Sequence, residues 1–328
     1  METSCDDTAV ALLLDEKVIF HQKKVQLIHT NFGGVVPELA SREHLAYVQK
    51  LIDQLINDSG ISVETINLIS ATRGPGLIGS LLVGYTYAKT LAYQLKIPLM
   101  GINHLEGHLY AGIMNNTDLQ FPFLALIISG GNTLLLEVRD HGCYKYLGQT
   151  RDDAAGEAID KVGTMLNLSY PAGPSMEKLT REGNPGMFKF PVPNPPQFDF
   201  SYSGLKTAVL YKLREMNEKQ IIKSRADIAA AFLDSLIRSL ILKLDKACKQ
   251  YNYTSILITG GVAVNSILQN KIRKKFTARG VKVFFPEPQW CGDNAAMIAY
   301  LGRLKYLRGE SPDKLDQSAD AQLKLDYC

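Results

Sequence analysis

The sequence predicts a mixed α/β fold built from two similar units. Short apolar segments with strand character alternate with segments of helical apolar period along the 328 residues. Residues 9–25 and 123–138 each have the pattern of a β-hairpin, and each hairpin has a small or acidic polar turn and is followed by helices. This repetition indicates a duplicated α/β unit that holds a ligand between the two polar turns.

The composition is that of a globular protein. Hydrophobic residues make up 46% and charged residues 21% of the chain, which excludes fibrous and disordered classes. The formal net charge of +3 is too small to identify a nucleic-acid binder, so local clusters must decide. Five scattered cysteines without a CxxC spacing predict neither a disulfide framework nor a thiolate zinc site, and favour a reducing compartment. No apolar run approaches the roughly 20 residues of a membrane span and no leader pattern precedes the first strand, so we expect a cytoplasmic protein without membrane contact.

The first third of the chain contains two polar turns of interest. The acidic turn, residues 1–8, usually serves as a structural cap, although its carboxylates can also hold a metal bound to phosphate. The turn at 74–76 lacks the lysine of a P-loop and the spacing of a dinucleotide fingerprint, so it is a weak phosphate signal. Around these turns we expect strands at 9–14 and 18–25, a helix around 45–56, a strand at 65–70 and a helix at 80–95.

Two histidines stand at the start of the next predicted helix. His104 and His108 follow a strand at 97–100, and at this spacing they share a helix face and can bind one metal ion. Asn103 is the predicted N-cap, with Glu106 as its capping-box partner. Glu106 comes two residues after His104, whereas the base of the zinc-protease pattern follows directly, so Glu106 is badly placed for that role. The spacing alone leaves open whether both histidines are ordinary polar residues at a helix start.

In the second part of the chain, acids and bases lie on predicted helices. Asp152 and Asp153 stand at the N-terminal end of a helix opening at 151–161, as the helix dipole favours, while Asp160 lies further along it. Asp293 begins the last helix, where it either caps the helix or binds a ligand. A basic helix after Gly260 and Gly261 presents either a solvated face or an RNA contact; its basic residues are Lys271, Arg273, Lys274, Lys275 and Arg279.

The remaining expected elements complete an alternating pattern. The segment 183–204 is rich in proline, glycine and aromatic residues and predicts a long ordered loop. The other elements are strands at 123–128, 134–138, 255–259 and 281–286, a glycine-containing turn at 129–133, and a strong helix at 227–249.

Three turns beside apolar strands, at 2–8, 129–133 and 260–261, resemble the phosphate- and adenosine-binding turns of the actin, heat-shock-protein and sugar-kinase fold. A longer sequence signature supports this likeness. Over almost its full length, the chain resembles the bacterial-type TsaD (Gcp) family of tRNA N6-adenosine threonylcarbamoyltransferases. The matching residues are Lys89, Thr90, Leu95, Lys96, Pro98, His104, Gly107, His108 and Leu109.

The resemblance implies an actin-like ATPase fold of the ribonuclease H-like class, with two duplicated α/β domains around a nucleotide cleft. The first domain would comprise 1–103 plus about 295–328, and the second 104–294 with the loop 183–204. The implied reaction moves the threonylcarbamoyl group from threonylcarbamoyl-AMP to N6 of adenosine 37 in tRNAs that read ANN codons, forming t6A and releasing AMP. The implied partners are the tRNA anticodon loop, a paralogous actin-like subunit and a small P-loop ATPase.

The family pattern also implies which residues carry the chemistry. His104, His108 and Asp293 would bind one divalent metal ion, Fe²⁺ or Zn²⁺. Asp6 and Asp7 match acids at which activity depends on an intact carboxylate, and we expect them to orient the amine or accept its proton. The residues expected to line the adenylate pocket are Ile127, Ile128, Ser129, Gly130, Gly131, Asp160, Gly173 and Asn265.

Some positions depart from the family pattern. Members usually have several apolar residues before the Glu-Thr-Ser stretch, forming a central first strand, whereas only Met1 precedes it here. Asn132 stands where bacterial members commonly have histidine, and residues 289–292 are atypical. The rival functions are a metalloprotease, an actin-like ATPase or kinase, and a non-catalytic paralogue, with Glu106 arguing against the first and the metal ligands against the third. The bacterial character of residues 5–8 and 152–157 favours a bacterial or organellar complex over an archaeal one, and we expect a bacterial cytoplasm rather than an organelle.

Overall fold

The computed structural model describes residues 1–325, which form two compact units. Unit 1 contains Met1–Asn115 and Asp293–Leu325, and unit 2 contains Asn116–Gly292. The helix that carries the two histidines, α3 (His104–Ile113), therefore belongs to unit 1, whereas the domain boundary predicted after residue 103 assigns it to the second domain. No helix in the described residues is long and apolar enough to cross a membrane.

Unit 1 contains two pairs of strands. β1 (Asp7–Leu14) and β2 (Lys17–Val25) form an antiparallel hairpin, and β3 (Ile69–Gly74) pairs in parallel with β4 (Leu99–Asn103). The strand predicted at 65–70 thus lies further along the chain, because residues 63–65 form a 3₁₀ turn and pairing with β4 begins only at Ile69.

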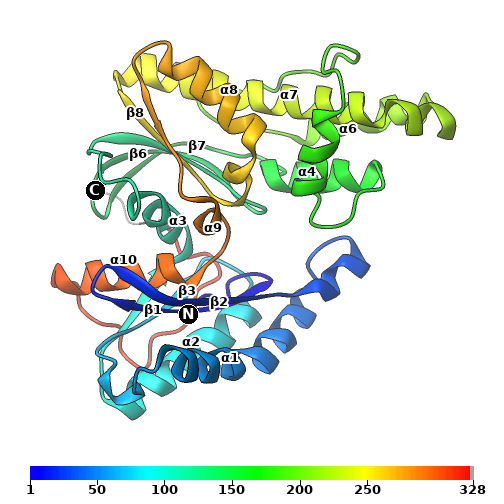
Figure 1. The fold of residues 1–328 in the computed structure, drawn as a ribbon. Coiled ribbons are helices and arrows are strands. Elements are labelled where there is room, and N and C mark those ends of the chain that lie inside the picture. The colour runs from blue at the N-terminus through cyan, green and yellow to red at the C-terminus, as the bar shows by residue number, and fades with distance from the viewer. Residues whose placement is uncertain (326–328) are drawn as a thin grey trace. The chain divides into compact units, whose positions relative to one another are not determined.

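Helices cover both faces of these strands. Figure 1 shows α1 and α2 on one side of the unit 1 strands and α10 on the other. Pro37 opens α1 and Gly60, with φ of 66°, ends it in the left-handed conformation that glycine tolerates. The helices of unit 1 are α1 (Pro37–Ser59), α2 (Ile78–Leu95), α3 and α10 (Ala295–Leu307), with 3₁₀ turns η1 (Leu27–Phe32) and η2 (Val63–Thr65).

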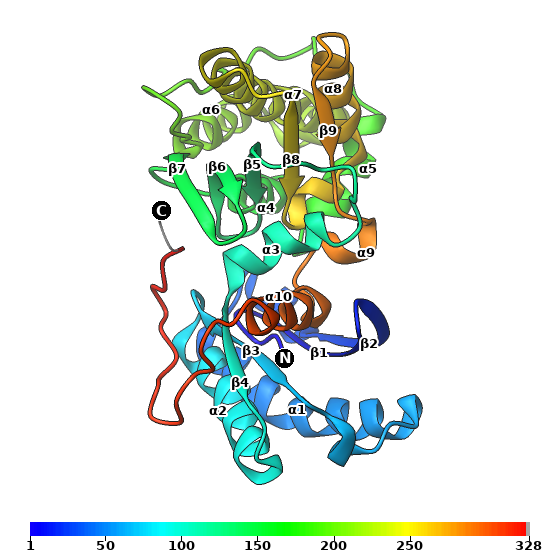
Figure 2. The ribbon, with the colours of Figure 1, turned by 90° about the vertical axis from the view of Figure 1, so that its left-hand side faces the viewer.

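Unit 2 is built on one five-stranded sheet in the order β7-β6-β5-β8-β9 (Figure 2). The sheet is antiparallel on the β6 side of β5 and parallel on its β8 side, and all six residues of β5 are buried. A strand covered on both faces requires a continuous apolar run, which this segment has. The strands are β5 (Phe123–Ile128), β6 (Thr133–Asp140), β7 (Cys143–Gln149), β8 (Ser255–Thr259) and β9 (Lys282–Phe284).

The long helix α7 forms the centre of the unit 2 core. Its predicted apolar stripe is confirmed, since Phe232, Leu236 and Leu240 are fully buried. The helix begins nine residues before the predicted start, at Glu218, where Asn217 and Gln220 form a capping box. The helices of unit 2 are α4 (Ala155–Met165), α5 (Gly173–Arg181), α6 (Ser203–Arg214), α7 (Glu218–Tyr251), η3 (Gly261–Val264), α8 (Ser266–Thr277) and α9 (Pro288–Cys291).

The segment between α5 and α6 is an ordered loop, as predicted. Phe198, Phe200 and Tyr202 are buried in the core, and the buried Lys243 ammonium of α7 donates hydrogen bonds to the carbonyls of Pro195 and Gln197. The loop is therefore held by both burial and hydrogen bonds. Elsewhere in unit 2, Cys143 is disulfide-bonded, a pairing that the cysteine spacing did not predict.

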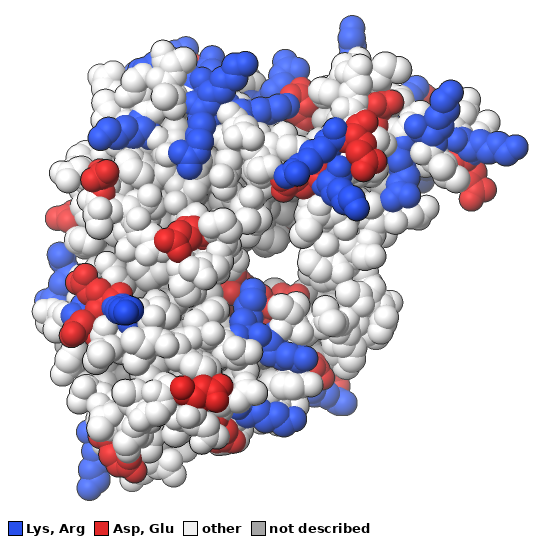
Figure 3. Space-filling view, viewed as in Figure 1, with Lys and Arg blue, Asp and Glu red and all other residues white. Residues whose placement is uncertain are grey.

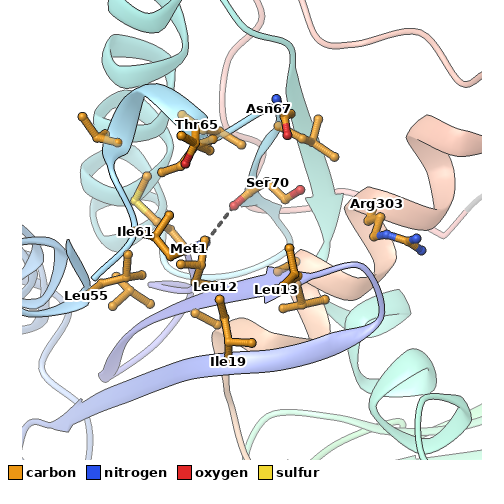
Figure 4. A pocket seen from close by; sticks show the side chains of 18 of the residues that line it. Met1, Leu12, Leu13, Ile19, Leu55, Ile61, Thr65, Asn67, Ser70 and Arg303 are labelled. Carbon is orange, nitrogen blue, oxygen red and sulfur yellow. Dashed lines mark hydrogen bonds between the residues drawn. The ribbon is translucent and has the colours of Figure 1, made fainter. Parts of the chain in front are cut away.

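An apolar slot separates the two strand pairs of unit 1. Within residues 1–325, backbone hydrogen bonds join β1 to β3 only through Met1 and Glu2. Glu2 and Ala9 exchange backbone hydrogen bonds of 3.0 and 2.9 Å. The Met1 amine donates to the Ser70 carbonyl at 2.7 Å, and the Met1 carbonyl accepts from the Thr72 N–H at 3.1 Å. Beyond Met1 lies a cavity of about 540 Å³ between residues 10–14 and 66–70. Figure 4 shows Leu12, Leu13, Leu55 and Ile61 around it.

The backbone hydrogen bonds of Met1 and Glu2 have the same antiparallel and parallel arrangement as those of β5 in unit 2. Glu2 is antiparallel to β1 as β5 is to β6, and the Met1 hydrogen bonds follow the parallel pattern that joins β5 to β8. The slot in unit 1 thus lies where unit 2 has the body of its central strand. Residues added before Met1 in extended conformation would meet apolar side chains and unpaired strand edges on both sides.

We therefore expect that an engineered extension of five residues rich in valine and isoleucine, placed before Met1, stabilises the protein. The added strand makes hydrogen bonds to β1 and β3 and buries apolar side chains in the slot, which should raise Tm by about 5 °C. Differential scanning calorimetry measures the change. A Ser/Gly extension of equal length is the control, and equal Tm values for both would contradict the expectation.

The effect of the extension on stability should also depend on pH. In a polypeptide made to begin at Met1, burial lowers the pKa of the Met1 α-amino group to about 6, against a partial opposing effect of Glu2. Between this value and its ordinary pKa the unfolded chain binds more protons, so the stability of the unextended protein rises with pH in that interval. The extended protein lacks this buried amine, and its gain in Tm should narrow as the pH rises from about 6 to about 8.

Candidate functional site

Two histidines and an aspartate of unit 1 form a compact cluster. Their potential ligand atoms all lie within 4.8 Å of one another, and we call His104, His108 and Asp293 the His–His–Asp cluster. The Asp293 Oδ1 atom lies 3.2 Å from Nε2 of His108 and 3.5 Å from Nε2 of His104. The two imidazole rings meet edge to face with centroids 4.7 Å apart. Both histidines are buried and Asp293 is half-buried.

The cap of α3 sets the positions of both histidines. The Asn103 Oδ1 atom accepts hydrogen bonds from the backbone N–H groups of Leu105 at 2.9 Å and Glu106 at 3.3 Å, which confirms the predicted N-cap. His104 is consequently the first helical residue, and His108 follows about one turn later on the same face. The buried Glu106 carboxylate forms a salt bridge with Lys305 of α10 at 3.2 Å rather than a capping box, so it is directed to α10.

The linker before α10 supplies the third member of the cluster. The cap of α10 is Asn294, whose side chain accepts a hydrogen bond from the Met297 N–H at 2.9 Å. Asp293 is therefore not the helix cap; it lies beside the two histidines, and its role as a ligand stays a prediction. The sequence did not distinguish the two adjacent residues because both Asp and Asn are common caps.

The cluster carries strongly shifted pKa values. Burial alone would lower the pKa of His104, but the carboxylates of Glu2 and Asp293 outweigh it and raise that pKa to about 9. Burial opposes ionisation of Asp293 as well, yet the His104 and His108 rings hold the pKa of its carboxyl well below its usual range. Opposite charges thus stabilise each other in a buried setting.

The donor set fits a divalent metal ion. Two imidazole nitrogens and one carboxylate oxygen are ligands that zinc and other first-row divalent ions accept, and three protein ligands leave a position open for a further group. The geometry shows that the side chains converge without rearrangement of the backbone, because all three potential ligand atoms already lie together.

The acidic turn is anchored close to this cluster in unit 1. His44 of α1 contacts it twice, through Nδ1 to the Thr8 hydroxyl at 2.7 Å and through Nε2 to the Cys5 carbonyl at 2.9 Å. Asp7 begins β1 and forms a salt bridge with Lys23 at 2.8 Å. Burial raises the pKa of Asp7 to about 7, although Lys23 opposes the shift.

The predicted adenylate residues lie in unit 2 around the end of β5. Ile127 and Ile128 are fully buried, so their side chains belong to the core. The following turn, Ser129–Thr133, is closed by a hydrogen bond from the Ser129 N–H to the Asn132 carbonyl at 2.9 Å. Gly130 and Gly131 are exposed at its tip, and a Cβ on either would meet no atom within 4 Å. The turn therefore presents backbone rather than side chains to a ligand.

Two glycines let other segments approach this turn closely. A Cβ on Gly156 of α4 would lie 2.4 Å from the Ser129 carbonyl oxygen, and one on Gly260 would lie 2.4 Å from that of Ile128. Gly260 also has φ of 96°, which favours glycine. The starts of α4 and η3 are thus packed against the strand end with no space for a side chain.

The other three predicted pocket residues have defined local roles. Asp160 of α4 accepts a hydrogen bond from the Ala172 N–H at 2.7 Å, which places it beside Gly173 at the start of α5. Asn265 caps α8 by accepting from the Leu268 N–H at 2.9 Å. The structure thus brings Asp160 and Gly173 together and gives Asn265 a cap role that the sequence did not assign.

The acids before α4 have different roles from those predicted. The helix begins at Ala155, so Asp152 and Asp153 lie outside it. Asp152 Oδ1 accepts from the backbone N–H groups of Tyr202 at 2.7 Å and Ser203 at 3.2 Å, at the start of α6. Asp153 forms salt bridges with Lys161 and Lys206. These hydrogen bonds and salt bridges, rather than an interaction with the dipole of α4, therefore set the positions of Asp152 and Asp153.

The basic residues predicted on this helix are largely used within unit 2, and Arg279 lies just after α8, which ends at Thr277. Lys271 pairs with Asp234 and Arg279 with Asp245, both on α7. Arg273 donates to the Val283 carbonyl at 3.2 Å and lies over the Phe285 ring. For three of the five basic residues, these contacts favour a structural role over contact with RNA.

Comparison with known sequences bears on the chain as a whole. A sequence profile of the family described as TsaD, tRNA N6-adenosine threonylcarbamoyltransferase, matches residues 17–300. A tRNA N6-adenosine threonylcarbamoyltransferase of Clostridium perfringens is 43% identical over 99% of this chain and 97% of its own length. One of Thermosipho africanus is 44% identical over 95% of each chain.

This chain belongs to the TsaD family. The matched range includes β2, the His–His–Asp cluster and the Ser129–Thr133 turn, so the family assignment covers residues of both units. The structure brings together the three residues that the resemblance implied as metal ligands, and their binding of a metal ion stays a prediction.

Solved structures show the mixed α/β fold at low sequence identity. HypF of T. kodakarensis has a TM-score of 0.60 at 16% identity, covering 82% of this chain and 44% of that chain. Component A of (R)-2-hydroxyglutaryl-CoA dehydratase from Acidaminococcus fermentans has a TM-score of 0.53 at 13% identity, covering 94% and 96%. The TsaD-family chain thus shares its α/β fold with proteins of other sequence.

Sequence reasoning missed one residue of the site. Glu2 is fully buried and its Oε2 atom lies 3.0 Å from Nδ1 of His104. The sequence placed Glu2 in a polar turn, where an acid is usually solvated. Only the fold shows that this turn is covered.

Proposed function

We propose that this chain transfers the threonylcarbamoyl group from threonylcarbamoyl-AMP to N6 of adenosine 37 in tRNAs that read ANN codons, forming t6A and releasing AMP. The observation that carries the proposal is 43% identity over nearly the whole chain to a curated tRNA N6-adenosine threonylcarbamoyltransferase. The presence of all three cluster residues supports an active enzyme over a non-catalytic paralogue.

We further propose that His104, His108 and Asp293 hold one divalent metal ion, Fe²⁺ or Zn²⁺. Such an ion supplies Lewis-acid stabilisation of negative charge on substrate oxygens when bound. The residues of the chain keep the ligand atoms converged, and burial of both histidines excludes water from their side of the site. The Glu106–Lys305 salt bridge argues against a metalloprotease, because the carboxylate that such an enzyme needs as base is engaged on α10.

The adenylate is proposed to bind at the end of β5. The backbone amides of Gly130 and Gly131 at the exposed tip of the turn suit phosphate oxygens, because backbone N–H groups are anion donors. Asp160, Gly173 and Asn265 line the remainder of the proposed pocket, with Ile127 and Ile128 contributing the strand beneath it. An actin-like ATPase or kinase is the second candidate that this site permits, and hydrolysis of ATP without tRNA is the property that separates it.

The proposed chemistry requires alignment rather than a nucleophilic side chain. The adenylate is an activated donor, so positioning the adenine amine beside it removes much of the barrier. The free cysteines are poor nucleophiles, because burial raises the pKa of the thiols of Cys248 and Cys291 to about 11 and also raises that of Cys5. This agrees with direct transfer to the amine.

Asp6 and Asp7 are proposed to orient the amine or accept its proton. A carboxylate whose pKa lies near 7, as burial makes that of Asp7, is matched to proton transfer at neutral pH. The salt bridge with Lys23 opposes a still higher pKa and keeps part of the population ionised.

The finer fold and the partners are also proposals. The shared sense of the Met1–Glu2 and β5 hydrogen bonds supports two duplicated actin-like domains. A single-stranded anticodon loop presents its base at low cost, and basic side chains hold the flanking backbone. Lys274 and Lys275 are exposed on α8, and Figure 3 shows further basic side chains, interspersed with acidic ones, over α6 and the start of α7. A paralogous actin-like subunit, a small P-loop ATPase and a bacterial cytoplasmic location complete the proposal.

Incubation of the protein with partner subunits, threonylcarbamoyl-AMP and unmodified tRNA should yield t6A and AMP in equal amounts. Mass analysis of the nucleosides checks the product, and tRNA with adenosine 37 replaced by guanosine is the control because it lacks the amine at the reacting position. Peptide cleavage abolished by a chelator, or ATP hydrolysis without t6A, would overturn the proposal.

Replacement of His104 by Ala should abolish stoichiometric metal binding, because one of three ligands is lost and the remaining pair no longer encloses an ion. Inductively coupled plasma mass spectrometry of the purified protein measures the metal content. His21→Ala, which alters a histidine of β2 outside the cluster, is the matched control. Equal metal content in the His104 variant and the wild type would exclude the site.

Asp7→Asn should lower the rate of t6A formation by about 100-fold or more, since it removes the proposed proton acceptor with little change of volume. Metal content and adenylate affinity should be retained. In Lys23→Met the pKa of Asp7 should rise, so the acid limb of the rate profile should move to higher pH. The exposed Asp15→Asn serves as control, and turnover of Asp7→Asn within about threefold of wild type would refute the role.

A further inference from the structure

We propose that Glu2 is a positioning residue that holds the His104 ring in the orientation and tautomer needed for metal binding. The inference rests on the proposed metal site and assigns a residue outside the ligand set. Glu2 is wholly buried, in a turn far from His104 in the sequence. A buried carboxylate is retained only when its charge and lone pairs are satisfied.

Three donors from separate segments fix the Glu2 carboxylate. Oε1 accepts from the Ser4 backbone N–H at 2.5 Å, Oε2 accepts from the Thr72 hydroxyl at 2.6 Å, and Oε2 lies 3.0 Å from Nδ1 of His104. The Glu2 backbone is fixed as well, by its paired hydrogen bonds with Ala9. The side chain therefore has one position, set by β1, β3 and the acidic turn.

This contact determines which ring nitrogen of His104 is available. A carboxylate beside Nδ1 accepts the Nδ1–H, so Nε2 is the nitrogen that gives up its proton and offers a lone pair when a metal ion binds. It is Nε2 that lies 3.5 Å from Asp293, on the side of the cluster. The hydroxyl of Ser4, 3.0 Å from Nδ1, reinforces the same edge of the ring.

The position of Glu2 also excludes it as a fourth ligand. It contacts Nδ1, whereas the cluster lies at Nε2, on the opposite side of the imidazole. A carboxylate that accepts the second N–H of a metal-binding histidine fixes the ring and raises its basicity, and loss of such a partner typically weakens metal binding by about 10- to 100-fold. The chemistry and the geometry therefore agree on an indirect role through His104.

Competition with a chromophoric chelator measures the Kd for Zn²⁺ in the wild type and in Glu2→Gln. The variant keeps the shape of the side chain and removes its charge, and its Kd should be about 10- to 100-fold higher than that of the wild type. Asp313→Asn is the matched control, because Asp313 contacts Arg73 and Tyr85 of unit 1 and lies outside the cluster; its Kd should equal that of the wild type.

The outcomes separate the inference from the proposed site. Absence of stoichiometric Zn²⁺ binding by the wild type would overturn the metal site itself, whereas wild-type binding with a Kd for Glu2→Gln within about twofold would overturn only the role of Glu2. A purely structural role would lower the Tm of the metal-free variant and leave its Kd unchanged. The ¹⁵N shifts of His104 provide a second readout, since the zinc-loaded wild type should show Nδ1–H and metal-bound Nε2.

If Glu2→Gln does not fold, Thr72→Val decides the question. It removes one hydrogen bond to the Glu2 carboxylate and leaves the carboxylate in place, so the Kd for Zn²⁺ should rise by a few fold. Thr72→Ser, which retains the hydroxyl, should restore the wild-type value. An unchanged Kd in Thr72→Val would count against the inference.

Discussion

A buried imidazole held between two carboxylates organises the site in unit 1. His104 meets Glu2 through Nδ1 and Asp293 through Nε2, and this links the acidic turn, α3 and the linker before α10. Burying three ionisable groups is unfavourable unless each has a partner, so the three segments stabilise one another only when all are in place. The Asn103 cap then places His108 beside the same carboxylate, because it makes His104 the first residue of the helix.

The same region also connects the strands of unit 1. Glu2 is at once the backbone partner of Ala9 and the side-chain partner of His104, while Met1 makes the bonds to β3. In unit 2 the equivalent connection is the six-residue strand β5, buried on both faces. The backbone link between the two strand pairs therefore runs through Met1 and Glu2, and Glu2 also orients the His104 ring. The slot lies beside Met1.

In unit 2, the proposed ligand site is shaped by close backbone packing rather than by pairs of charged side chains. The turn after β5 has few side chains to direct, and it is shaped by close approach of α4 and η3 at Gly156 and Gly260. Backbone groups at the tip remain exposed while the strand beneath is fully buried. Rigid backbone on a buried strand is well suited to recognising an oxygen-rich group, since the donors need no ordering when the ligand binds.

Features encoded by neighbouring residues were determined by the sequence alone. The apolar period of α7, the two hairpins and the Asn103 cap all depend on contacts within a few positions, and a long signature including the two histidines indicated the family. Tertiary structure decided which charged groups meet. Asp152 binds the start of α6 instead of supporting α4, Lys271 pairs with Asp234, Asn294 rather than Asp293 caps α10, and Glu2 reaches His104. Such pairs join distant segments, and a charged side chain carries no local mark of the partner that folding will bring to it.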